Sequence, residues 1–364
     1  MKLMERRTRV LLLTPDIGGG GAQHVMLLVA RGLSREKFEV HLGLVRAGDP
    51  EADAVPPEVR VHAMGPGRAR AATLRLLRLV WRLRPDVILS SAPEISFLAL
   101  LLRPFFPART RVLVRQNGTV SAGLAHGGVP RYTRSLYRLL YRRADRVICQ
   151  SRAMAEDLAR ETGVPNEQIV VLPNPVDLEG ILAARDAPSA WNGPGPHLLA
   201  VGRLSREKGF DLLLEALAKL RKRFPVADLI LVGSGREEVA LKALCRTLEI
   251  ETAVCFAEQV NPPYAFFKGA TIFVLPSRYE GMPNALLEAA AAGLPLVSTP
   301  ASGGVVDLLT GRPGAWLATD VSASALTNAL EKALEDLEPG ARFHHGFFRR
   351  QRCRMHESWC TAHH

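Results

Sequence analysis

The sequence predicts an α/β protein with two doubly wound, Rossmann-like domains, and three observations lead to this fold class. The chain has 364 residues, more than a single hydrophobic core usually serves. Short apolar runs alternate with helical patterns along most of its length. The runs are continuous rather than alternating in polarity, which is typical of parallel strands that helices cover on both faces. Strands and helices in alternation then give repeated βαβ units.

Each apolar run is expected to form one strand of a parallel sheet. In chain order the runs are residues 10–14, 40–45, 86–90, 112–114 and 146–150, then 197–202, 228–233, 271–276 and 294–298. The clearest helical patterns between them are residues 22–33, 211–223, 237–248 and 323–337. A further pattern at residues 68–84 is basic and amphipathic. It suits the outer helix of a βαβ unit, and binding to anionic lipid would be an added role.

A stretch rich in Pro, Gly and Asn divides these units into two series. The domains that follow are residues 1–173, a linker at 174–196, residues 197–337, and an atypical basic tail at 338–364. Ligands bind at the carboxyl ends of the strands in open parallel sheets. We therefore expect the two domains to face a common cleft.

The charge is concentrated in the first half of the chain. The net charge is +11, and residues 1–180 contain 27 Lys and Arg against 17 Asp and Glu. Nucleic acid and an anionic membrane surface are both partners for such a basic half. No zinc finger, homeodomain pattern or aromatic RNA-binding motif is present, and only 6% of the residues are aromatic. The sequence therefore argues against nucleic acid as a partner.

Cysteine usage and hydropathy indicate the compartment. Five cysteines are scattered along the chain, which favours a reducing environment without a disulfide framework. No apolar stretch approaches the roughly 18 residues of a membrane-spanning helix. The N-terminal residues also lack a signal-peptide pattern. A cytoplasmic location is expected.

Two loops that follow predicted strands carry residues suited to binding an anion. In TPDIGGGGAQHV, Gly20 and Gly21 stand directly before a predicted helix, whose N-terminus favours negative charge. The spacing does not match the dinucleotide fingerprint GxGxxG, and a flexible turn is the alternative. In VGRLSREKGF, Arg203 and Lys208 are expected to project into the crevice and to suit a phosphate. The alternative here is an ordinary solvated loop.

The stretch SRYEGMPNALLEAAAAG, residues 277–293, places two glutamates eight residues apart. Pro283 suits the first turn of a helix, so Glu280 is expected just before the helix and Glu288 between one and two turns into it. Free N–H groups at the helix N-terminus favour a phosphate, and carboxylates accept hydrogen bonds from hydroxyl groups. The pattern suits a sugar on one side of a diphosphate and a ribose on the other. The alternative is two exposed glutamates, one of which favours a helix start.

Together these residues resemble the family of retaining, nucleotide-sugar-dependent glycosyltransferases of the family four type, which have the two-Rossmann fold called GT-B. Their E-x7-E hallmark is matched by Glu280 and Glu288. GGGGA, LPNPVD, VGRLSREKG, LVGSG and SGGVVDLL also follow the family's order, over roughly residues 8 to 337. The form NPPYAFFKGATIFVLPSRYEGMPNALLEA is most similar to bacterial enzymes that extend lipid-linked or cell-surface glycans.

The resemblance implies a role for each of the charged residues. Glu280 would contact the hydroxyls of the donor sugar, and Glu288 would hold the ribose. Arg203 and Lys208 would neutralise the diphosphate. Because these cations and a helix dipole would stabilise the leaving group, no metal and no other cofactor is expected.

The resemblance also assigns uncharged residues. Gly20 and Gly21 would let the first domain close on the donor phosphates, and the segment that ends at Val260 would border the base. His126 is the candidate for a histidine that many relatives carry after the fifth strand of the first domain. The residues near the sugar and phosphate would be Gly281, Met282 and Asn284.

The chain departs from the family pattern in three places. Where relatives have that histidine, this chain reads Gln116 and Asn117, and Gln23 stands where relatives of the GGAE type have a glutamate. The usual helical C-terminus is missing after Leu337, so the tail is expected to be poorly ordered or loosely docked. Its spacing C-x2-H-x3-C-x2-H invites a zinc interpretation, against which a disordered tail is preferred.

The partners implied by the resemblance are a nucleotide-sugar donor, linked to UDP or GDP, and an acceptor that the first domain would bind. The acceptor would be a glycan or a polyprenyl-diphosphate-linked glycan. An anionic membrane surface, at the inner face of the cell membrane, would be a further partner. Two rival hypotheses are a nucleotide-sugar epimerase of the same fold, which the E-x7-E set argues against, and an inactive membrane-associated scaffold.

Overall fold

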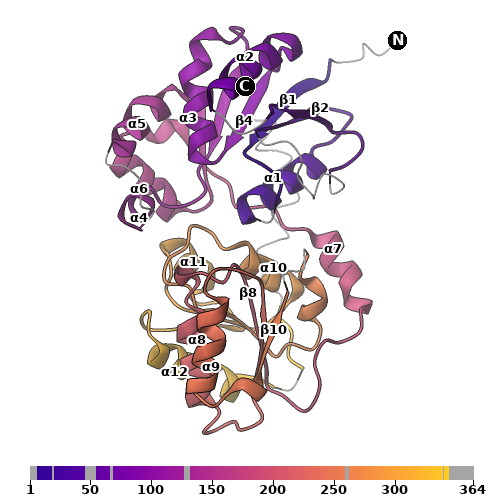
Figure 1. Ribbon diagram of the computed structural model, residues 1–364, viewed down its shortest axis with the longest axis vertical. Coiled ribbons are helices and arrows are strands. Elements are labelled where there is room, and N and C mark those ends of the chain that lie inside the picture. The colour runs from indigo at the N-terminus through magenta and orange to yellow at the C-terminus, as the bar shows by residue number, and fades with distance from the viewer. Residues whose placement is uncertain are drawn as a thin grey trace. The chain divides into compact units, whose positions relative to one another are not determined.

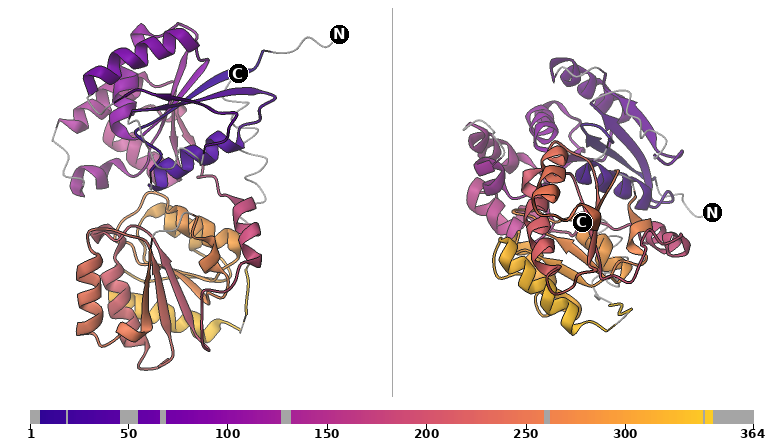
Figure 2. Two further views of the ribbon diagram at one scale, coloured as in Figure 1. Left: turned by 45° about the vertical axis from the view of Figure 1, so that its right-hand side comes forward. Right: turned by 60° about the horizontal axis from the view of Figure 1, so that its bottom comes forward.

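The computed structural model describes residues 6–18, 20–45, 55–65, 69–126, 132–258, 262–338 and 340–343. The chain forms two compact units, Met1–Pro175 (unit 1) and Val176–His364 (unit 2) (Figure 1). Each unit contains a parallel sheet packed against helices (Figure 2). The α/β fold class is therefore confirmed. None of the helices in the described ranges is long and apolar enough to cross a membrane.

Within its described residues, unit 1 contains a seven-stranded parallel sheet in the order β3-β2-β1-β4-β5-β6-β7. The strands are β1 (Thr8–Thr14), β2 (Phe38–Leu44), β3 (Arg60–Ala63), β4 (Val87–Ser91), β5 (Arg111–Arg115), β6 (Arg146–Cys149) and β7 (Ile169–Val171). The α-helices are α1 (Gly21–Gly32), α2 (Ala69–Leu83), α3 (Pro93–Leu102), α4 (Val120–His126), α5 (Thr133–Leu140) and α6 (Arg152–Thr162).

The interior of unit 1 explains its continuous apolar runs. Successive side chains of a strand point to opposite faces of the sheet, and Leu11, Leu12 and Leu13 of β1 are all fully buried. Leu11 and Leu13 belong to the core that includes Leu76 of α2 and Leu100 of α3. Both faces of the strand are therefore covered, which removes the alternation of an exposed strand.

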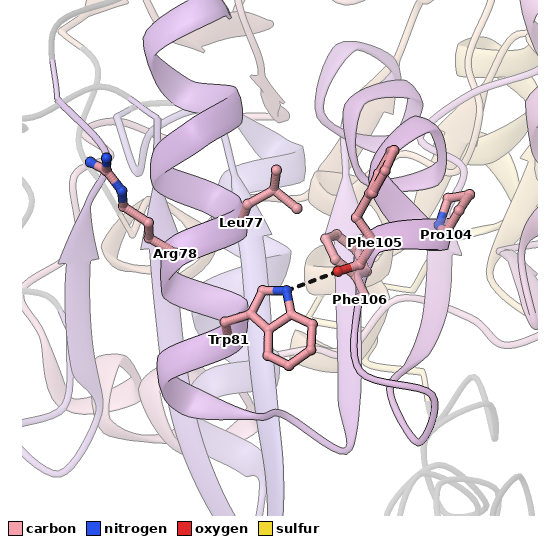
Figure 3. A pocket seen from close by; sticks show the side chains of 6 residues that line it. All are labelled: Leu77, Arg78, Trp81, Pro104, Phe105 and Phe106. Carbon is pink, nitrogen blue, oxygen red and sulfur yellow. Dashed lines mark hydrogen bonds between the residues drawn. The ribbon is translucent and has the colours of Figure 1, made fainter.

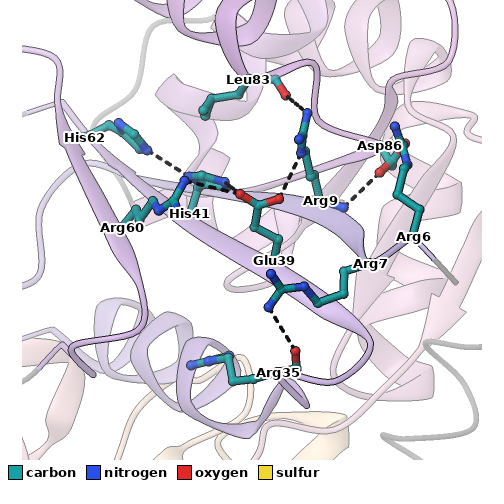
Figure 4. A network of polar contacts seen from close by, with 10 residues as sticks. All are labelled: Arg6, Arg7, Arg9, Arg35, Glu39, His41, Arg60, His62, Leu83 and Asp86. Carbon is teal, nitrogen blue, oxygen red and sulfur yellow. Dashed lines mark hydrogen bonds and ion pairs between the residues drawn. The ribbon is translucent and has the colours of Figure 1, made fainter. Parts of the chain in front are cut away.

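A polar network joins three neighbouring strands of unit 1 (Figure 4). Arg9 on β1 donates a 2.9 Å hydrogen bond from Nε to Glu39 on β2. The other carboxylate oxygen of Glu39 lies 3.3 Å from Nε2 of the buried His41 and 3.4 Å from Arg60 on β3. His41 Nδ1 and His62 Nε2 are 3.0 Å apart. Burial lowers the pKa of both histidines.

The described part of unit 2 contains a six-stranded parallel sheet in the order β10-β9-β8-β11-β12-β13. The strands are β8 (His197–Val201), β9 (Asp228–Val232), β10 (Val254–Ala257), β11 (Ile272–Leu275), β12 (Leu296–Ser298) and β13 (Ala315–Leu317). The α-helices are α7 (Leu178–Ala183), α8 (Phe210–Leu220), α9 (Glu238–Thr247), α10 (Asn284–Ala292), α11 (Gly303–Leu309) and α12 (Ala323–Asp336).

Two apolar cores lie on the two faces of this second sheet. Leu198 and Val274 belong to the core formed with α8, α9 and α12. Their chain neighbours Leu199 and Phe273 belong to the other core, which includes residues of α7, α10 and α11. The strands are thus buried on both sides, and the helices on the two faces position the loops that connect them.

Two segments outside the two predicted domains contact unit 2. Residues 174–196, predicted as a linker, contain α7, and Ile181 and Trp191 of this stretch lie in a core of unit 2. The start of the predicted tail, residues 340–343, contacts the rest of unit 2. The Phe343 amide donates to the Gly293 carbonyl at 3.0 Å, and its ring meets Trp316 edge to face. The proposed Cys and His zinc residues of the tail lie outside the described residues.

Candidate active site

The strand order of unit 2 reverses between β8 and β11. These two strands are neighbours in the sheet, whereas β9 and β10 extend to one side and β12 and β13 to the other. In open α/β sheets, ligands bind at such a switch point, outside the carboxyl ends of the strands. The loop after β8 carries Arg203 and Lys208, and the loop after β11 carries Glu280. The fold therefore brings these predicted residues to one edge of one sheet.

The two loops approach each other so closely that one glycine is required. Gly209, which ends the loop after β8, has φ of +64°, and a Cβ at this position would lie 2.1 Å from the carbonyl oxygen of Pro276. No other residue fits without moving the backbone. The amide of Arg278 in the second loop also donates to the Glu207 carbonyl at 2.8 Å.

Lys208, Glu280 and Ser277 form a compact polar cluster. Lys208 Nζ and Ser277 Oγ each lie 2.6 Å from the same carboxylate oxygen, Oε1 of Glu280. Ser277 is fully buried, and its carbonyl accepts a 2.5 Å hydrogen bond from Thr299 Oγ1. The side chain of Glu280 is only 10% exposed. Glu280 is therefore a positioned carboxylate, and the alternative of an exposed glutamate is wrong for this residue.

A second ion pair holds the same loops together. Arg278 donates two 2.7 Å hydrogen bonds to Asp211 in the first turn of α8, one to each carboxylate oxygen. Burial alone would raise the pKa of Asp211, but the hydrogen bonds and charge of Arg278 outweigh it and lower the pKa. A bidentate pair of this kind fixes geometry as well as charge. Neither residue was among the predicted site residues.

Glu288 lies inside α10 and is buried, with 6% of its surface exposed. Burial raises the pKa of its carboxyl group to about 7, and the negative charge of Asp177 adds to the rise. Asp177 caps α7 by accepting a 2.9 Å hydrogen bond from the Gly180 amide, and α7 packs against α10. The fold therefore places a carboxyl group that titrates near neutral pH on the helix that follows Glu280.

The start of α10 is built from the remaining predicted residues. Pro283 is the N-cap, so the helix begins at Asn284 instead of at the proline. Gly281 and Met282, in the approach to the helix, are half-buried, as is Asn284. The Gly281 carbonyl accepts a 3.1 Å hydrogen bond from Ser302 Oγ. Arg203 is exposed at the mouth of the loop after β8.

Unit 1 holds Gly20, Gly21 and His126 of the predicted residues. Gly20 is the N-cap of α1, and a Cβ there would lie 2.1 Å from the Gln23 side-chain oxygen. Gly21 is the first residue of the helix. His126 is the last residue of α4, but its side chain and the whole of Val260 lie outside the described residues.

The carboxyl edge of the unit 1 sheet contains a buried polar group that the sequence did not indicate. Arg115, the last residue of β5, donates hydrogen bonds to Asn117 and, at 2.6 Å, to Asn174. Burial lowers the pKa of its guanidinium to about 10. Gln116 is buried as well and accepts a 2.9 Å hydrogen bond from the Tyr141 hydroxyl. Gln116 and Asn117, where relatives carry a histidine, are thus structural members of this edge.

The described residues contain no group of His, Cys, Asp and Glu that could hold a metal ion. The charged groups on the two loops at the switch point of unit 2 include Arg203, Lys208 and Glu280, and Glu288 follows in α10. Cations suit a diphosphate, and carboxylates suit hydroxyl groups.

Comparisons of the sequence with known proteins match both halves of the chain. The family model "Glycosyltransferase Family 4" matches residues 19–179, and "Glycosyl transferases group 1" matches residues 183–345. A glycogen synthase of Mycobacterium tuberculosis is 30% identical over 308 residues, which cover 82% of this chain and 72% of that protein. A Campylobacter jejuni enzyme named N-acetylgalactosamine-N,N'-diacetylbacillosaminyl-diphospho-undecaprenol 4-alpha-N-acetylgalactosaminyltransferase is 26% identical over 340 residues, 88% of each chain.

Among solved structures, Anabaena Alr3699/HepE in complex with UDP has a TM-score of 0.77 with this chain. The match has 17% sequence identity and covers 98% of this chain and 100% of that one. At this identity the likeness shows a shared fold, the GT-B fold. Together with the family models and the extended match to the glycogen synthase, it establishes that the chain belongs to the group 1 glycosyltransferases of family 4, enzymes that transfer a sugar from a nucleotide sugar.

Proposed function

We propose that this protein is a retaining, metal-independent hexosyltransferase of bacterial glycan synthesis. The donor would be a sugar linked to a nucleoside diphosphate, and the acceptor a glycan or a polyprenyl-diphosphate-linked glycan. The observation that carries the proposal is the cluster of Lys208, Glu280 and Ser277 at the switch point of unit 2, followed by the buried Glu288 in α10.

The diphosphate is assigned to the cations and to the start of α10. Lys208 already has a carboxylate partner 2.6 Å away, so its ammonium is held at the edge of the sheet before any ligand binds. Arg203 is exposed on the same loop and supplies a second positive charge. The dipole of α10, whose positive end lies at Asn284, favours a phosphate as well. These groups would stabilise the charge that develops on the leaving diphosphate.

The sugar and the ribose are assigned to the two glutamates. Glu280, with Gly281 beside it, would accept hydrogen bonds from the donor sugar, and Glu288 would accept them from the ribose. The segment containing Val260 would border the base. Uridine is the base favoured by comparison, because the Anabaena relative was solved with UDP, and further structures of it hold UDP with glucose and UDP-glucose. Guanosine remains the second candidate.

The proposed chemistry needs no strong base from the protein. The bond between the anomeric carbon and the diphosphate oxygen breaks, and the acceptor hydroxyl forms the new bond on the same face of the sugar. The hydroxyl proton passes to an oxygen of the leaving diphosphate. Unit 1 would contribute Gly20 and Gly21 near the donor phosphates and His126 near the reacting sugar.

The acceptor proposal rests on relatives and on charge. The C. jejuni relative is named for a diphospho-undecaprenol substrate, and a Rhizobium meliloti relative, 28% identical over 264 residues, is named a lipopolysaccharide core biosynthesis glycosyltransferase. The first half of this chain is basic, which suits an acceptor that carries a diphosphate. We therefore place the enzyme at the cytoplasmic face of the cell membrane, as a peripheral protein.

Two substitutions test the roles of the glutamates. Glu288→Ala should weaken binding of the nucleotide, whereas Glu280→Ala should lower turnover more than nucleotide affinity. Each lost hydrogen bond to a charged group should cost about 1.5–3 kcal/mol. Nucleotide binding is measured by calorimetry, and turnover by nucleotide release in the presence of acceptor. Glu238→Ala, at a half-buried glutamate of α9 that pairs with Lys242, serves as the matched control and should change neither quantity.

Five results would overturn the proposal or part of it. Unchanged kinetics in both glutamate variants would remove the assignment of the site. Loss of activity in EDTA, with recovery in magnesium, would exclude a metal-free mechanism. A product whose anomeric configuration is inverted, as read by NMR, would exclude retention. Epimerisation of the donor without an acceptor would favour the rival epimerase, and nucleotide binding without any turnover would favour an inactive scaffold.

A further inference from the structure

The loop that carries Glu280 is held by the loops on both sides of it. On the side of β12, Thr299 Oγ1 donates a 2.5 Å hydrogen bond to the Ser277 carbonyl, and the Glu280 amide donates to the Ala301 carbonyl at 3.1 Å. On the side of β8, the loop is tied by Arg278, which precedes Glu280 by two residues. The position of Glu280 is therefore set from two directions.

Arg278 donates hydrogen bonds to three residues that surround Lys208 in the chain. Its amide donates to the Glu207 carbonyl at 2.8 Å, and its Nη1 donates to the Arg206 carbonyl at 3.0 Å. Nη1 and Nη2 also donate 2.7 Å hydrogen bonds to the two carboxylate oxygens of Asp211. Arg278 thus contacts the chain before Lys208 and after it, and it fixes the turn from which the lysine side chain extends.

The sheet itself does not join these loops. The ladder between β8 and β11 pairs their first halves, and its last pair among the described residues is Leu199 with Phe273. The two strands then continue to Val201 and Leu275, where the loops begin. The backbone pairing stops short of the site, so contacts between the loops must set the distance between Lys208 and Glu280.

The geometry of the Glu280 carboxylate makes this distance important. Lys208 Nζ and Ser277 Oγ both lie 2.6 Å from the same oxygen, Oε1. The other oxygen, Oε2, accepts no hydrogen bond from any described residue, although the side chain is only 10% exposed. A shift of the loop would turn Oε2 away from a ligand hydroxyl and would separate Oε1 from the ammonium. Such preorganised contacts are sensitive to displacements of about 1 Å.

The Arg278–Asp211 pair has the properties of a group that fixes geometry rather than one that supplies stability. Its side chains are 28% and 40% exposed, and exposed ion pairs contribute little to the free energy of unfolding. The hydrogen bonds to Asp211 raise the pKa of Arg278, so both groups stay charged and the pair persists at neutral pH. Two parallel hydrogen bonds also restrict the orientation of the guanidinium.

We propose that the Arg278–Asp211 pair is a positioning device for sugar transfer, which holds Glu280 and Lys208 at the separation that the donor sugar and its diphosphate require. Neither Arg278 nor Asp211 would touch the donor. The proposal deepens the proposed function and rests on its assignment of Lys208 and Glu280. Because the ribose is assigned to Glu288, loss of the pair should lower turnover far more than nucleotide affinity.

The test compares kcat and KM of single and double variants. Arg278→Ala and Asp211→Ala should each lower kcat about tenfold, with KM for the donor within about threefold of the wild-type value. The double variant should be no slower than either single one, since breaking the pair once removes its effect. Arg278→Lys keeps the charge without the two parallel hydrogen bonds, so its kcat should be intermediate.

Chemical rescue gives a readout that a purely structural role would not change. Guanidinium, at concentrations far below those that unfold the protein, should restore part of the kcat of Arg278→Ala and none of that of Glu280→Ala. Arg278 is half-buried, so the small cation has access to the space that the side chain leaves. Arg278→Lys and Asp211→Asn cover the event that an alanine variant fails to fold.

A second double variant tests whether Arg278 acts through Glu280. Arg278→Ala combined with Glu280→Ala should be faster than the product of the two single effects predicts, because the positioned carboxylate is already absent. Effects on kcat that simply multiply would show that Arg278 acts independently of Glu280, and this would overturn the proposal.

One matched control lies at the other end of α8. Arg223, just after the helix, forms an ion pair with Glu335 of α12, and both side chains are exposed. Like Arg278 with Asp211, this pair joins two separate elements of unit 2, but it lies at the end of α8 that leads to the amino end of β9. Arg223→Ala should leave kcat and KM unchanged.

A further control lies in unit 1, in a hollow of about 590 Å³ between α2 and the short 3-10 helix η2 (Arg103–Phe105). The Trp81 indole donates a 2.9 Å hydrogen bond to the Phe105 carbonyl and so ties these two elements together (Figure 3). Trp81→Phe removes this bond and should leave kcat unchanged on a water-soluble acceptor. A loss of kcat in both controls that matches the loss in Arg278→Ala would show a general effect of stability and would overturn the proposal.

The outcomes separate this proposal from the proposed function. If Glu280→Ala loses turnover while Arg278→Ala and Asp211→Ala retain the wild-type kcat, the positioning role fails and the proposed function stands. If Glu280→Ala and Lys208→Ala both retain wild-type kinetics, the proposed function fails, and the positioning role that rests on it fails as well. Slow pair variants with unchanged nucleotide affinity, rescued by guanidinium, would support both.

Discussion

At the scale of single residues, the protonation of Glu288 should govern donor binding. Burial, together with the charge of Asp177, raises the pKa of its carboxyl group to about 7. Ribose hydroxyls donate hydrogen bonds to the ionised form, so binding should favour release of the proton. We expect nucleotide-sugar affinity to increase between about pH 6 and pH 8, by up to roughly tenfold per pH unit on the acid side. Calorimetry over this range measures the effect. The diphosphate of the donor is esterified at both ends and does not titrate in this range, so it adds no pH dependence of its own.

Glu288→Gln is the control for this prediction, because the amide keeps the shape of the side chain and removes its proton equilibrium. Affinity of this variant should be lower and independent of pH.

The stability of the free protein offers a second test of the protonation of Glu288. The folded pKa lies above the ordinary value of 4.5, so the stabilising effect of the protonated group is lost as pH rises through about 7. Above that pH, the free energy of unfolding of the variant should therefore exceed that of the wild-type protein by up to about 3 kcal/mol. A pH profile identical to that of the wild-type enzyme would contradict the assignment.

The sequence indicates some residues of this site and not others, for a physical reason. Glu280 and Glu288 are eight residues apart, one in a loop and one in the helix that follows it. The local sequence pattern is therefore sufficient to predict the element in which each of them lies. Ser277 resembles any loop serine, and its burial under Thr299 appears only in the fold. Asp177 is far from Glu288 in the chain, and only the packing of α7 on α10 brings their charges together.

At the scale of secondary-structure elements, the histidine pair across β2 and β3 should make unit 1 sensitive to acid. Burial lowers the pKa of His41 and of His62, although the charge of Glu39 opposes the shift in His41. The unfolded chain then binds protons more readily than the folded one, so stability is complete above the ordinary pKa of 6.5 and declines as pH falls below it. His41→Gln should reduce this decline by up to about 1.4 kcal/mol per pH unit.

Chemical denaturation at pH 7 and at pH 5 measures that decline for the wild-type protein and the variant. The comparison is between the two pH slopes, so a general loss of stability in the variant does not affect the conclusion. Equal slopes would show that the pair stays neutral over this range or that its protonation does not oppose folding.

The strands that the sequence did not indicate share one property: they form the edges of the two sheets. The central strands appear in the sequence as continuous apolar runs, whereas β3, β7, β10 and β13 are short and only partly buried. An edge strand has one neighbour and less cover, so polar residues such as Arg60 and His62 are tolerated in it. The sequence pattern of β3 therefore resembles that of a loop, and only its pairing with β2 in the structure identifies it as a strand.

At the scale of the whole molecule, the Pro-, Gly- and Asn-rich stretch at residues 174–196 contains the division between the two units. The division falls between Pro175 and Val176, so most of the segment expected to be a linker belongs to unit 2. Trp191 explains this assignment, because its ring stacks on His197 and its indole donates to the Phe266 carbonyl at 3.0 Å. Turn-forming residues such as Pro, Gly and Asn indicate irregular backbone, but they do not show whether that backbone is a free linker or packs against a core, as it does here.

Each unit has cores of its own, which leads to a prediction about the separated halves. Within the part of the chain that the structure describes, the cores on the two faces of the unit 2 sheet contain residues of unit 2 alone. Residues 176–364 should therefore fold cooperatively without unit 1. They should bind a nucleotide sugar within about tenfold of the affinity of the whole chain, because the proposed contacts to ribose, base and diphosphate are mostly theirs. They should transfer no sugar, since the acceptor is assigned to unit 1. Glu288→Ala in this half should weaken its nucleotide binding by about 1.5–3 kcal/mol, as in the whole chain. An unfolded half, or one that turns over at the rate of the whole enzyme, would contradict the division of labour proposed for the two units.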